Sequence, residues 1–163
     1  MEIPSEKYFK IINVPMDGNC LFTSLAIGLR NLKGLDIDAA YVRREIAEFY
    51  IENLELQLND GTLSEWMRRS EHCVNCYIRK ISKNGEWGSH MDTVMASLRF
   101  KIQINIWTFN SEKGEFSSIE TISPKNILGK TSKKKIGELT EKIVEKSINI
   151  LWNGKDHYDY LDI

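Results

Sequence analysis

Proline, cysteine and long hydrophobic runs are all scarce in this chain of 163 residues. Three prolines and ten glycines are too few for a disordered linker, and no internal repeat is apparent, so we expect a single domain over residues 1–163. Every apolar stretch is far shorter than the ~20 residues that cross a bilayer, which predicts a protein without a membrane segment. The chain also opens without the basic and apolar regions of a signal peptide.

Neither charge sign is in excess. The 22 basic and 23 acidic side chains leave a net charge of −1, and this balance argues against a general nucleic-acid binder, which needs a strong positive field. The three cysteines cannot all pair with one another, which favours a reducing compartment and hence a cytoplasmic protein. A chain of this length can bury a core without disulfides or a structural metal.

Hydrophobic spacing predicts helices in the first half of the chain. Apolar residues recur at helical spacing over residues 20–29 and again over residues 39–50. Residues 62–65 (Thr-Leu-Ser-Glu) have the capping-box pattern of a helix start, and residues 89–92 (Ser-His-Met-Asp) have a weaker version of it. We therefore expect four helices before residue 101.

Strands are predicted mainly in the second half. Ile102, Ile104 and Ile106 alternate with polar residues, which marks residues 101–108 as the clearest strand. Extended structure is also expected at residues 8–14, 119–122, 148–152 and 158–161, and solvated loops at residues 111–118 and 125–140. Helices followed by strands favour an α+β fold.

The most informative stretch for chemistry is residues 17–22 (Asp-Gly-Asn-Cys-Leu-Phe). A glycine-containing turn delivers Cys20 to the first turn of a helix, where free N–H groups and the helix dipole should lower the pKa of its thiol below about 8.5. The N–H groups of Gly18, Asn19 and Cys20 are also placed to bind an oxyanion. Taken alone, this fragment is more typical of a buried, inert thiol.

A second candidate group lies near the other end of the chain. A nucleophilic cysteine needs a base and a third group that orients the base. If residues 157–160 are extended, His157 and Asp159 project from the same face, so the carboxylate can hold one imidazole nitrogen. Taken alone, this pair is more typical of a surface histidine.

Together, residues 17–22 and 157–159 (His-Tyr-Asp) resemble the ovarian-tumour (OTU) family of papain-like cysteine proteases. Residues 85–89 (Gly-Glu-Trp-Gly-Ser) resemble the middle of that family, and most closely the viral OTU domains of the nairovirus type. Thr23 departs from the pattern, because many members carry a larger polar residue there. The resemblance implies a papain-like α+β fold with a small central sheet packed between helices.

The resemblance also implies roles for single residues. Cys20 would be the nucleophile, His157 the general base and Asp159 the residue that orients His157. The N–H groups of Gly18, Asn19 and Cys20 would form the oxyanion hole, with Asp17 beside it, and Trp87 and Gly88 would line the channel for the substrate tail. No cofactor and no metal is implied.

The implied activity is that of a deubiquitinase, which hydrolyses the isopeptide bond after the C-terminal Gly-Gly of ubiquitin through a thioester. The expected partners are ubiquitin or polyubiquitin and, further, ubiquitin-like modifiers, with no nucleic acid and no membrane, and we expect a monomer. A viral origin would place the protein in the host cytoplasm, where it would counter host ubiquitin signalling.

Two alternatives remain open from the sequence. His72, Cys73 and Cys76 suggest a zinc module, but only one Cys-x-x-Cys pair exists and a zinc site wants four ligands, so a helix that carries two thiols is the preferred interpretation. A catalytically inactive ubiquitin-binding module would keep the fold and lack the chemistry, although all the candidate catalytic residues are present.

Overall fold

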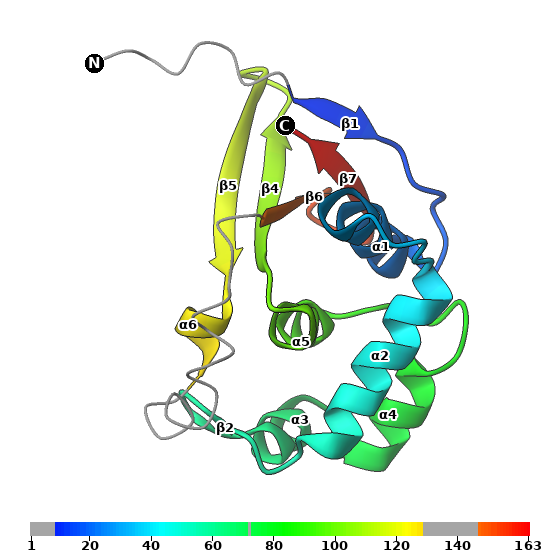
Figure 1. Cartoon of the computed structure of the whole chain (residues 1–163). Helices are drawn as coiled ribbons and strands as arrows, with labels where there is room; N and C mark the ends of the chain where they lie inside the picture. Colours follow the sequence, from blue (N-terminus) through cyan, green and yellow to red (C-terminus); the bar gives the residue numbers. More distant parts are fainter. Residues whose placement is uncertain (1–8, 72, 129–146) are drawn as a thin grey trace.

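A five-stranded mixed sheet forms one side of the molecule (Figure 1). The computed structural model describes residues 9–71, 73–128 and 147–163. The strand order is β1-β7-β6-β4-β5, in which β4 and β6 are parallel and all other neighbours are antiparallel. The strands of this sheet are β1 (Lys10–Ile12), β4 (Gln103–Asn110), β5 (Glu115–Ile122), β6 (Ser147–Trp152) and β7 (Tyr158–Asp162).

The helices lie beside and below the sheet, with α1 against β6 and β7 and α5 near β4 and β5 (Figure 1). Helices α2, α3 and α4 form a further layer, because α2 packs on α1, α4 and α5. A small hairpin of β2 (Gln57–Leu58) and β3 (Gly61–Thr62) precedes α3. The helices are α1 (Cys20–Lys33), α2 (Ala39–Glu52), α3 (Leu63–Glu71), α4 (Val74–Ile81), α5 (His90–Phe100) and α6 (Pro124–Ile127).

The buried face of the sheet carries the predicted isoleucines. Ile104 and Ile106 on β4 and Ile148 and Ile150 on β6 are almost fully buried, which confirms the period of two in the sequence. Gly28 allows α1 to approach this face, because a Cβ there would lie 2.6–2.8 Å from three side-chain carbons of Ile148. The α1 helix is thereby held close to the sheet.

The opposite face of the sheet carries polar side chains and aromatic rings. Its side chains form a polar ladder, in which the Asn149 Oδ1 accepts hydrogen bonds from Asn105 (3.0 Å) and from the Trp107 indole (2.9 Å). Thr121 donates to Asn105 at 3.1 Å. Aromatic rings pack next to this ladder, with Phe9 against Trp107 and Phe116.

The predicted helices and strands are otherwise confirmed, apart from three corrections and one additional helix, α4, which follows α3 and makes five described helices before residue 101 where four were expected. Strand β5 begins at Glu115 and not at residue 119, because pairing with β4 extends to the hairpin turn. Residues 125–128 are not a solvated loop, because they form α6 and its C-cap and bury Ile127 and Leu128 in the core; residues 129–140 of that expected loop lie outside the described residues. Tyr8, at the start of the expected arm, also lies outside them.

The third correction concerns cysteine. Cys73 and Cys76 form a disulfide at the start of α4 and are not two free thiols, whereas Cys20 is free. The two cysteines are three residues apart at a helix start, which brings their side chains together. An odd number of cysteines leaves one unpaired, and this one is Cys20.

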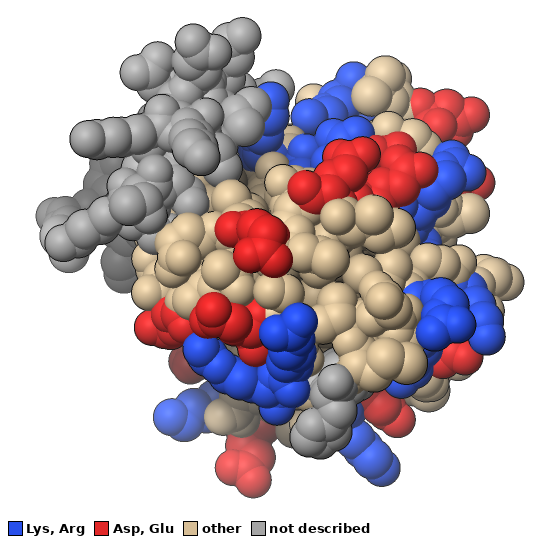
Figure 2. Space-filling view, turned by 90° about the horizontal axis from the view of Figure 1, so that it is seen from below, with Lys and Arg blue, Asp and Glu red and all other residues tan. Residues whose placement is uncertain are grey.

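The described surface shows the even balance of acidic and basic side chains that the composition predicts. Acidic and basic side chains are interspersed around an uncharged area on the face seen in Figure 2. No helix in the described ranges is both long and apolar enough to cross a membrane. The described residues also include no cluster of three or more metal-ligating side chains.

Candidate active site

The structure places Cys20 at the first position of α1, as predicted. A tight turn precedes it, in which the Asp17 carboxylate accepts a hydrogen bond from the Asn19 N–H at 2.9 Å. Gly18 is required in this turn, because a Cβ at this position would lie 1.5 Å from the carbonyl oxygen of Gly85. The turn before Cys20 is therefore packed directly against the backbone of a second loop.

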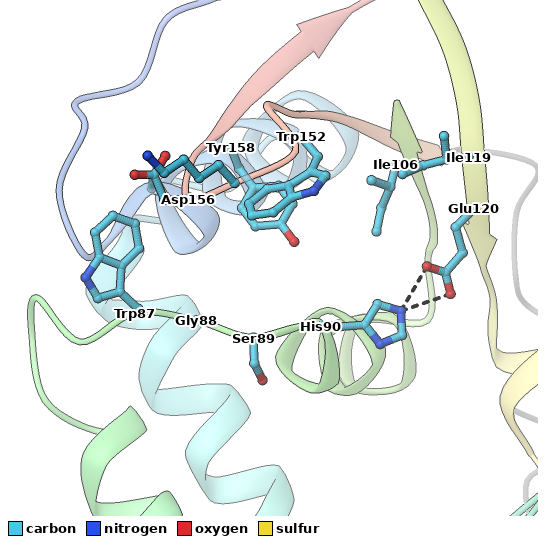
Figure 3. Close-up of a pocket in the computed structure, with 12 residues that line it drawn as sticks. Trp87, Gly88, Ser89, His90, Ile106, Ile119, Glu120, Trp152, Asp156 and Tyr158 are labelled. Atoms are coloured by element: carbon cyan, nitrogen blue, oxygen red, sulfur yellow. Dashed lines mark hydrogen bonds and ion pairs between the residues drawn. The ribbon is translucent and has the colours of Figure 1, made fainter. Parts of the chain in front are cut away.

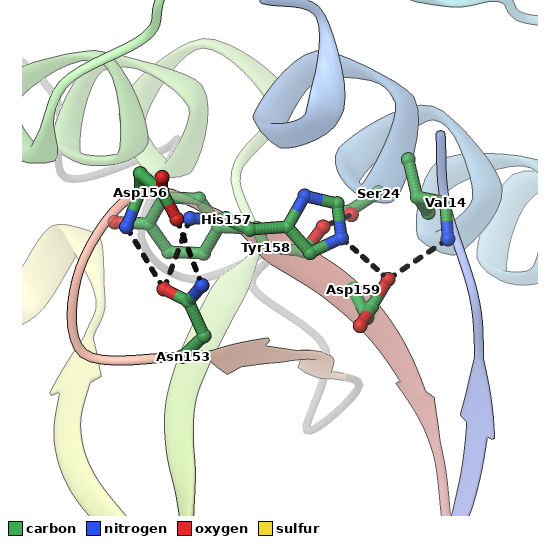
Figure 4. Close-up of polar contacts among 7 residues, drawn as sticks. All are labelled: Val14, Ser24, Asn153, Asp156, His157, Tyr158 and Asp159. Atoms are coloured by element: carbon green, nitrogen blue, oxygen red, sulfur yellow. Dashed lines mark hydrogen bonds and ion pairs between the residues drawn. The ribbon is translucent and has the colours of Figure 1, made fainter. Parts of the chain in front are cut away.

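His157 and Asp159 form the predicted pair. His157 Nε2 lies 2.8 Å from Asp159 Oδ1, across one residue of extended backbone (Figure 4). The same carboxylate oxygen accepts a hydrogen bond from the Val14 N–H at 2.8 Å, just beyond β1. Asn153 shapes the turn that leads into β7, because its side-chain oxygen accepts from the His157 N–H at 3.0 Å. The Val14 N–H thus fixes the carboxylate of Asp159, and Asn153 fixes the backbone of His157.

The sulfur of Cys20 lies next to this pair, although the two ends of the site come from opposite ends of the chain. The backbone of Tyr158, the residue after His157, hydrogen bonds to the Cys20 side chain, and Asp159 acts on it electrostatically. Ser24, one turn further along α1, donates to the Tyr158 carbonyl at 3.4 Å. Packing of α1 on β7 therefore places the thiol against the backbone of the residue that follows His157.

The imidazole has one nitrogen left for chemistry. His157 is only 7% exposed, and its Nδ1 has no hydrogen-bond partner among the described residues. A buried ring nitrogen without a partner is costly in a structural histidine. Because Asp159 occupies Nε2, the free Nδ1 is the atom available to take a proton.

The expected low pKa of Cys20 is wrong in this structure. Burial raises the pKa of the Cys20 thiol, because the side chain is only 2% exposed and burial disfavours the thiolate. Backbone N–H groups of Tyr158 and Leu21 lower it, as the helix-start argument expected, but they do not outweigh burial. Asp17 and Asp159 raise it further.

The three backbone N–H groups expected to bind the oxyanion differ in their hydrogen bonds within the described residues. The Asn19 N–H donates to Asp17 Oδ1, and the Cys20 N–H makes a longer bond of 3.3 Å to the Asp17 carbonyl. The Gly18 N–H meets no acceptor within the described part of the chain. Asp17 thus fixes the turn through both its side chain and its backbone.

A pocket of about 510 Å³ opens beside Cys20 (Figure 3). Trp87, which is 48% exposed, and Gly88 stand at one end of it. At the other end His90 Nε2 pairs with Glu120 at 2.9 Å. The aromatic rings of Trp152 and Tyr158, 4.7 Å apart between ring centres, form the wall between these ends. His157 is buried beside the pocket and does not line it.

Sequence reasoning missed Arg43. This side chain on α2 is buried, and its guanidinium hydrogen bonds to the turn that precedes Cys20. A signal was present, because Arg43 stands at helical spacing with the apolar residues Ile46, Ala47 and Tyr50. A charged residue on the apolar stripe of a helix indicates a buried polar contact.

The zinc alternative finds no support in the described residues. Cys73 and Cys76 are bonded to each other, and His72 lies outside the described residues. A thiol that lines a pocket, with a buried pair of imidazole and carboxylate nearby, is by contrast typical of a papain-like cysteine protease.

Comparison with known families agrees with that class. The profile of the family described as OTU-like cysteine protease matches residues 15–158, and the chain belongs to this family. The resemblance carried by residues 17–22 and 157–159 is thereby confirmed.

Individual proteins show the same likeness. The putative ubiquitin thioesterase 232R of Invertebrate iridescent virus 3 is 26% identical over 76% of this chain, which spans only 15% of that protein's length. The viral OTU domain protease of Taggert virus has a TM-score of 0.63 and 26% identity, covering 94% of this chain and 79% of that one. An OTU deubiquitinase of Wolbachia pipientis wMel, solved bound to ubiquitin, has a TM-score of 0.63 and 20% identity, covering 94% and 95%. The α+β OTU fold and the likeness to viral OTU domains are therefore as expected.

Proposed function

We propose that this domain is a deubiquitinase that uses Cys20 as its nucleophile. The observation that carries the proposal is the buried His157–Asp159 pair beside a free thiol at the edge of a pocket. Relatives described as ubiquitin thioesterases, and the related structure bound to ubiquitin, support ubiquitin as the substrate.

In the first step, His157 Nδ1 takes the proton of the Cys20 thiol while the sulfur attacks the C-terminal glycine carbonyl of ubiquitin. Asp159 holds Nε2 and stabilises the imidazolium that forms. Because burial raises the pKa of Cys20, the thiol depends on this base and is not a free thiolate at neutral pH. The tetrahedral oxyanion lies near the Gly18, Asn19 and Cys20 backbone, with Asp17 keeping the turn in place.

In the second step, His157 returns the proton to the leaving lysine amine, and the C–N isopeptide bond breaks to leave a thioester on Cys20. Water then attacks the thioester with His157 again as base, which releases ubiquitin and restores the thiol. Trp87 and Gly88 flank the channel for the glycine-glycine tail, which needs a narrow entrance. We further propose ubiquitin-like modifiers as additional substrates and, for a viral protein, the opposing of host ubiquitin signalling.

A ubiquitin probe with an electrophilic C-terminus tests the proposal. Wild-type protein should form a covalent adduct, and Cys20→Ala should form none. Cys73→Ser/Cys76→Ser keeps Cys20 as the only cysteine and should react like wild type. Asp159→Asn should react at least about 100-fold more slowly, because the imidazole loses its orienting group, whereas Asp162→Asn, an exposed change on the same strand, should not.

Binding of ubiquitin without adduct formation by the wild type would contradict the proposal and favour the inactive binding module. An adduct that survives Cys20→Ala would move the nucleophile elsewhere. Incubation with linkage-defined diubiquitins and a ubiquitin-like control then measures which substrates are cleaved.

A further inference from the structure

Arg43 is buried in an unusual way. It is 3% exposed, and no other arginine or lysine is buried within residues 9–71, 73–128 and 147–163. Its guanidinium lies 4.0 Å from the centre of the Phe22 ring, on the α1 turn that follows Cys20. Burial lowers the pKa of Arg43, because removal from water disfavours the cation. Its Nε has no hydrogen-bond partner among the described residues, so all of its hydrogen bonds come from Nη1 and Nη2.

The acceptors of Arg43 lie in two separate stretches of the chain, the turn before Cys20 and the end of α4 with the loop after it. Nη2 donates to the Gly18 carbonyl at 3.3 Å and to Asn19 Oδ1 at 2.7 Å, both in the turn before the nucleophile. Nη2 also donates to the Glu86 carbonyl at 2.8 Å, and Nη1 donates to the Ile81 carbonyl at 2.8 Å. Every one of these acceptors is uncharged, so the guanidinium joins two stretches of chain and does not form an ion pair.

Asn19 extends this connection between the loops. Its Oδ1 accepts from the Gly85 N–H at 3.0 Å as well as from Arg43, and its Nδ2 donates to Asn84 at 2.8 Å. With Gly18 pressed against the Gly85 carbonyl, the turn before Cys20 and residues 84–86 share one polar contact. Arg43 closes the buried side of that contact.

The two loops line the same pocket. One ends in Cys20, and the other continues into Trp87 and Gly88. A substrate tail bound in this pocket reaches the sulfur correctly only if the two loops keep a fixed position relative to each other. The guanidinium is suited to fixing it, because its planar fork holds several acceptors at once and in set directions.

We propose that Arg43 is a positioning residue for acyl transfer, which sets the nucleophile turn against the loop that carries Trp87. This inference rests on the proposed function. Arg43 touches neither the reacting atoms nor the substrate channel, so it acts through Gly18, Asn19 and Glu86.

Two readouts on the same sulfur separate positioning from simple stabilisation. Hydrolysis of ubiquitin carrying a C-terminal fluorophore needs the carbonyl, the donors and the sulfur aligned, and a misplacement of about 1 Å can cost ~100-fold in rate. Alkylation of Cys20 by iodoacetamide needs only the thiol and its base. The charged groups that act on Cys20 are Asp17 and Asp159, so loss of the guanidinium should leave alkylation in place.

The experiment compares Arg43→Met and Arg43→Lys with Arg44→Met, an exposed change at the next position of α2. For Arg43→Met we expect kcat/KM to fall about 100-fold while the alkylation rate stays within about twofold of wild type. Arg43→Lys keeps the charge without the fork, so we expect a loss of about tenfold. Arg44→Met should match wild type in both readouts. Urea unfolding of each variant shows that it is folded.

Hydrolysis by a folded Arg43→Met at the wild-type rate would overturn the positioning role. So would an equal fall in hydrolysis and alkylation, because that result means general disruption of the site. If Arg43→Met does not fold, Arg43→Lys is used in its place, and its kcat/KM and its alkylation rate are each compared with those of wild type. A wild-type protein that is alkylated but hydrolyses no ubiquitin substrate would instead overturn the proposed function.

Discussion

At the scale of single residues, Cys20 shows how a helix start and burial oppose each other. Amide donors at the helix start favour the thiolate, but removal of the sulfur from water favours the thiol more strongly. A resting thiol is protected from oxidation and from chance alkylation, since the thiolate is the reactive form. In the proposed mechanism, the thiol therefore depends on His157 as its base when substrate binds.

This dependence predicts how alkylation of Cys20 varies with pH. Because the folded state raises the pKa of the thiol, His157→Ala should alkylate slowly at neutral pH and reach its plateau only above the value of about 8.5 for a free thiol. Wild type should react at least about tenfold faster at pH 7, because the imidazole accepts the proton. The measurement is the second-order rate constant with iodoacetamide from pH 5 to pH 10, with a free cysteine derivative as reference. Superimposable profiles for the two proteins would exclude His157 as the base.

At the scale of elements, α4 is held at its start by a disulfide and a cap. Cys73 is the N-cap of this helix, and its sulfur accepts from the Cys76 N–H at 3.2 Å. Further along α4, Tyr77 contacts Ser89 and Ile81 accepts from Arg43, so the helix borders the loop that carries Trp87. The disulfide lies at the far, exposed end of the helix from these contacts.

Removal of the disulfide should therefore affect stability more than catalysis. A loop this short restricts the unfolded chain little, and closing it is worth about 2 kcal/mol. In Cys73→Ser/Cys76→Ser the new hydroxyl can cap the helix, which returns up to about 1 kcal/mol. We expect the free energy of unfolding in urea to fall by about 1 kcal/mol and kcat/KM to stay unchanged. A large loss of turnover in the folded variant would show that the start of α4 is coupled to the pocket.

Elements with a strong repeating pattern are predictable from the sequence, and short ones are not. The apolar spacing along α1 and α2 and the alternating isoleucines of β4 are enough to locate these three elements. The β2–β3 hairpin and α6 are two to four residues long, which is too short for a period to show. Their conformation comes from contacts that are distant in sequence, such as the bridge between Leu58 and Leu128.

The candidate site likewise has features that the sequence predicts and features that it does not. The helix start at Cys20 and the i, i+2 pairing of His157 with Asp159 are predictable from local patterns, whereas their proposed catalytic roles come from the resemblance of both segments together to one family. The raised pKa of Cys20 is not predictable, because it depends on the packing of β7 over the helix start. The partners of Arg43 are equally hidden, since most of them are backbone carbonyls and any residue has one.

At the scale of the whole molecule, three helices meet at one buried carboxylate. Asp92 on α5 is fully buried and accepts hydrogen bonds from Tyr50 on α2 and Tyr77 on α4, each at 2.7 Å. The Ser89 N–H donates to the same carboxylate at 2.8 Å, which fixes the start of α5 beside the pocket. Burial raises the pKa of Asp92 in spite of these donors.

This network predicts a pH-dependent stability. Because the folded pKa of Asp92 is raised, the folded chain keeps its proton at pH values where the unfolded chain, with a pKa of about 3.9, has lost it. The contribution of Asp92 to stability is therefore greatest below about pH 4 and falls as the pH rises toward the folded pKa. We expect Asp92→Asn to lower the free energy of unfolding by about 1–3 kcal/mol.

The difference between wild type and Asp92→Asn should grow as the pH is lowered from 7 to 5, since only the wild type gains from protonation. Urea unfolding at several pH values measures it. Asp36→Asn, an exposed change outside the helices, serves as the control. A difference that stays constant or shrinks on acidification would show that Asp92 is ionised in the folded protein throughout this range.

The insertion of β7 between β1 and β6 also has a consequence for the newly made chain. A ribosome releases Cys20 long before it reaches His157, and at 5–20 residues per second the delay is roughly ten seconds. During that time the place of β7 between β1 and β6 is empty, and the sulfur lacks the Tyr158 backbone beside it. If the proposed function holds, an unfinished copy of the domain is unable to hydrolyse the ubiquitin around it, and activity arises only when β7 has been added.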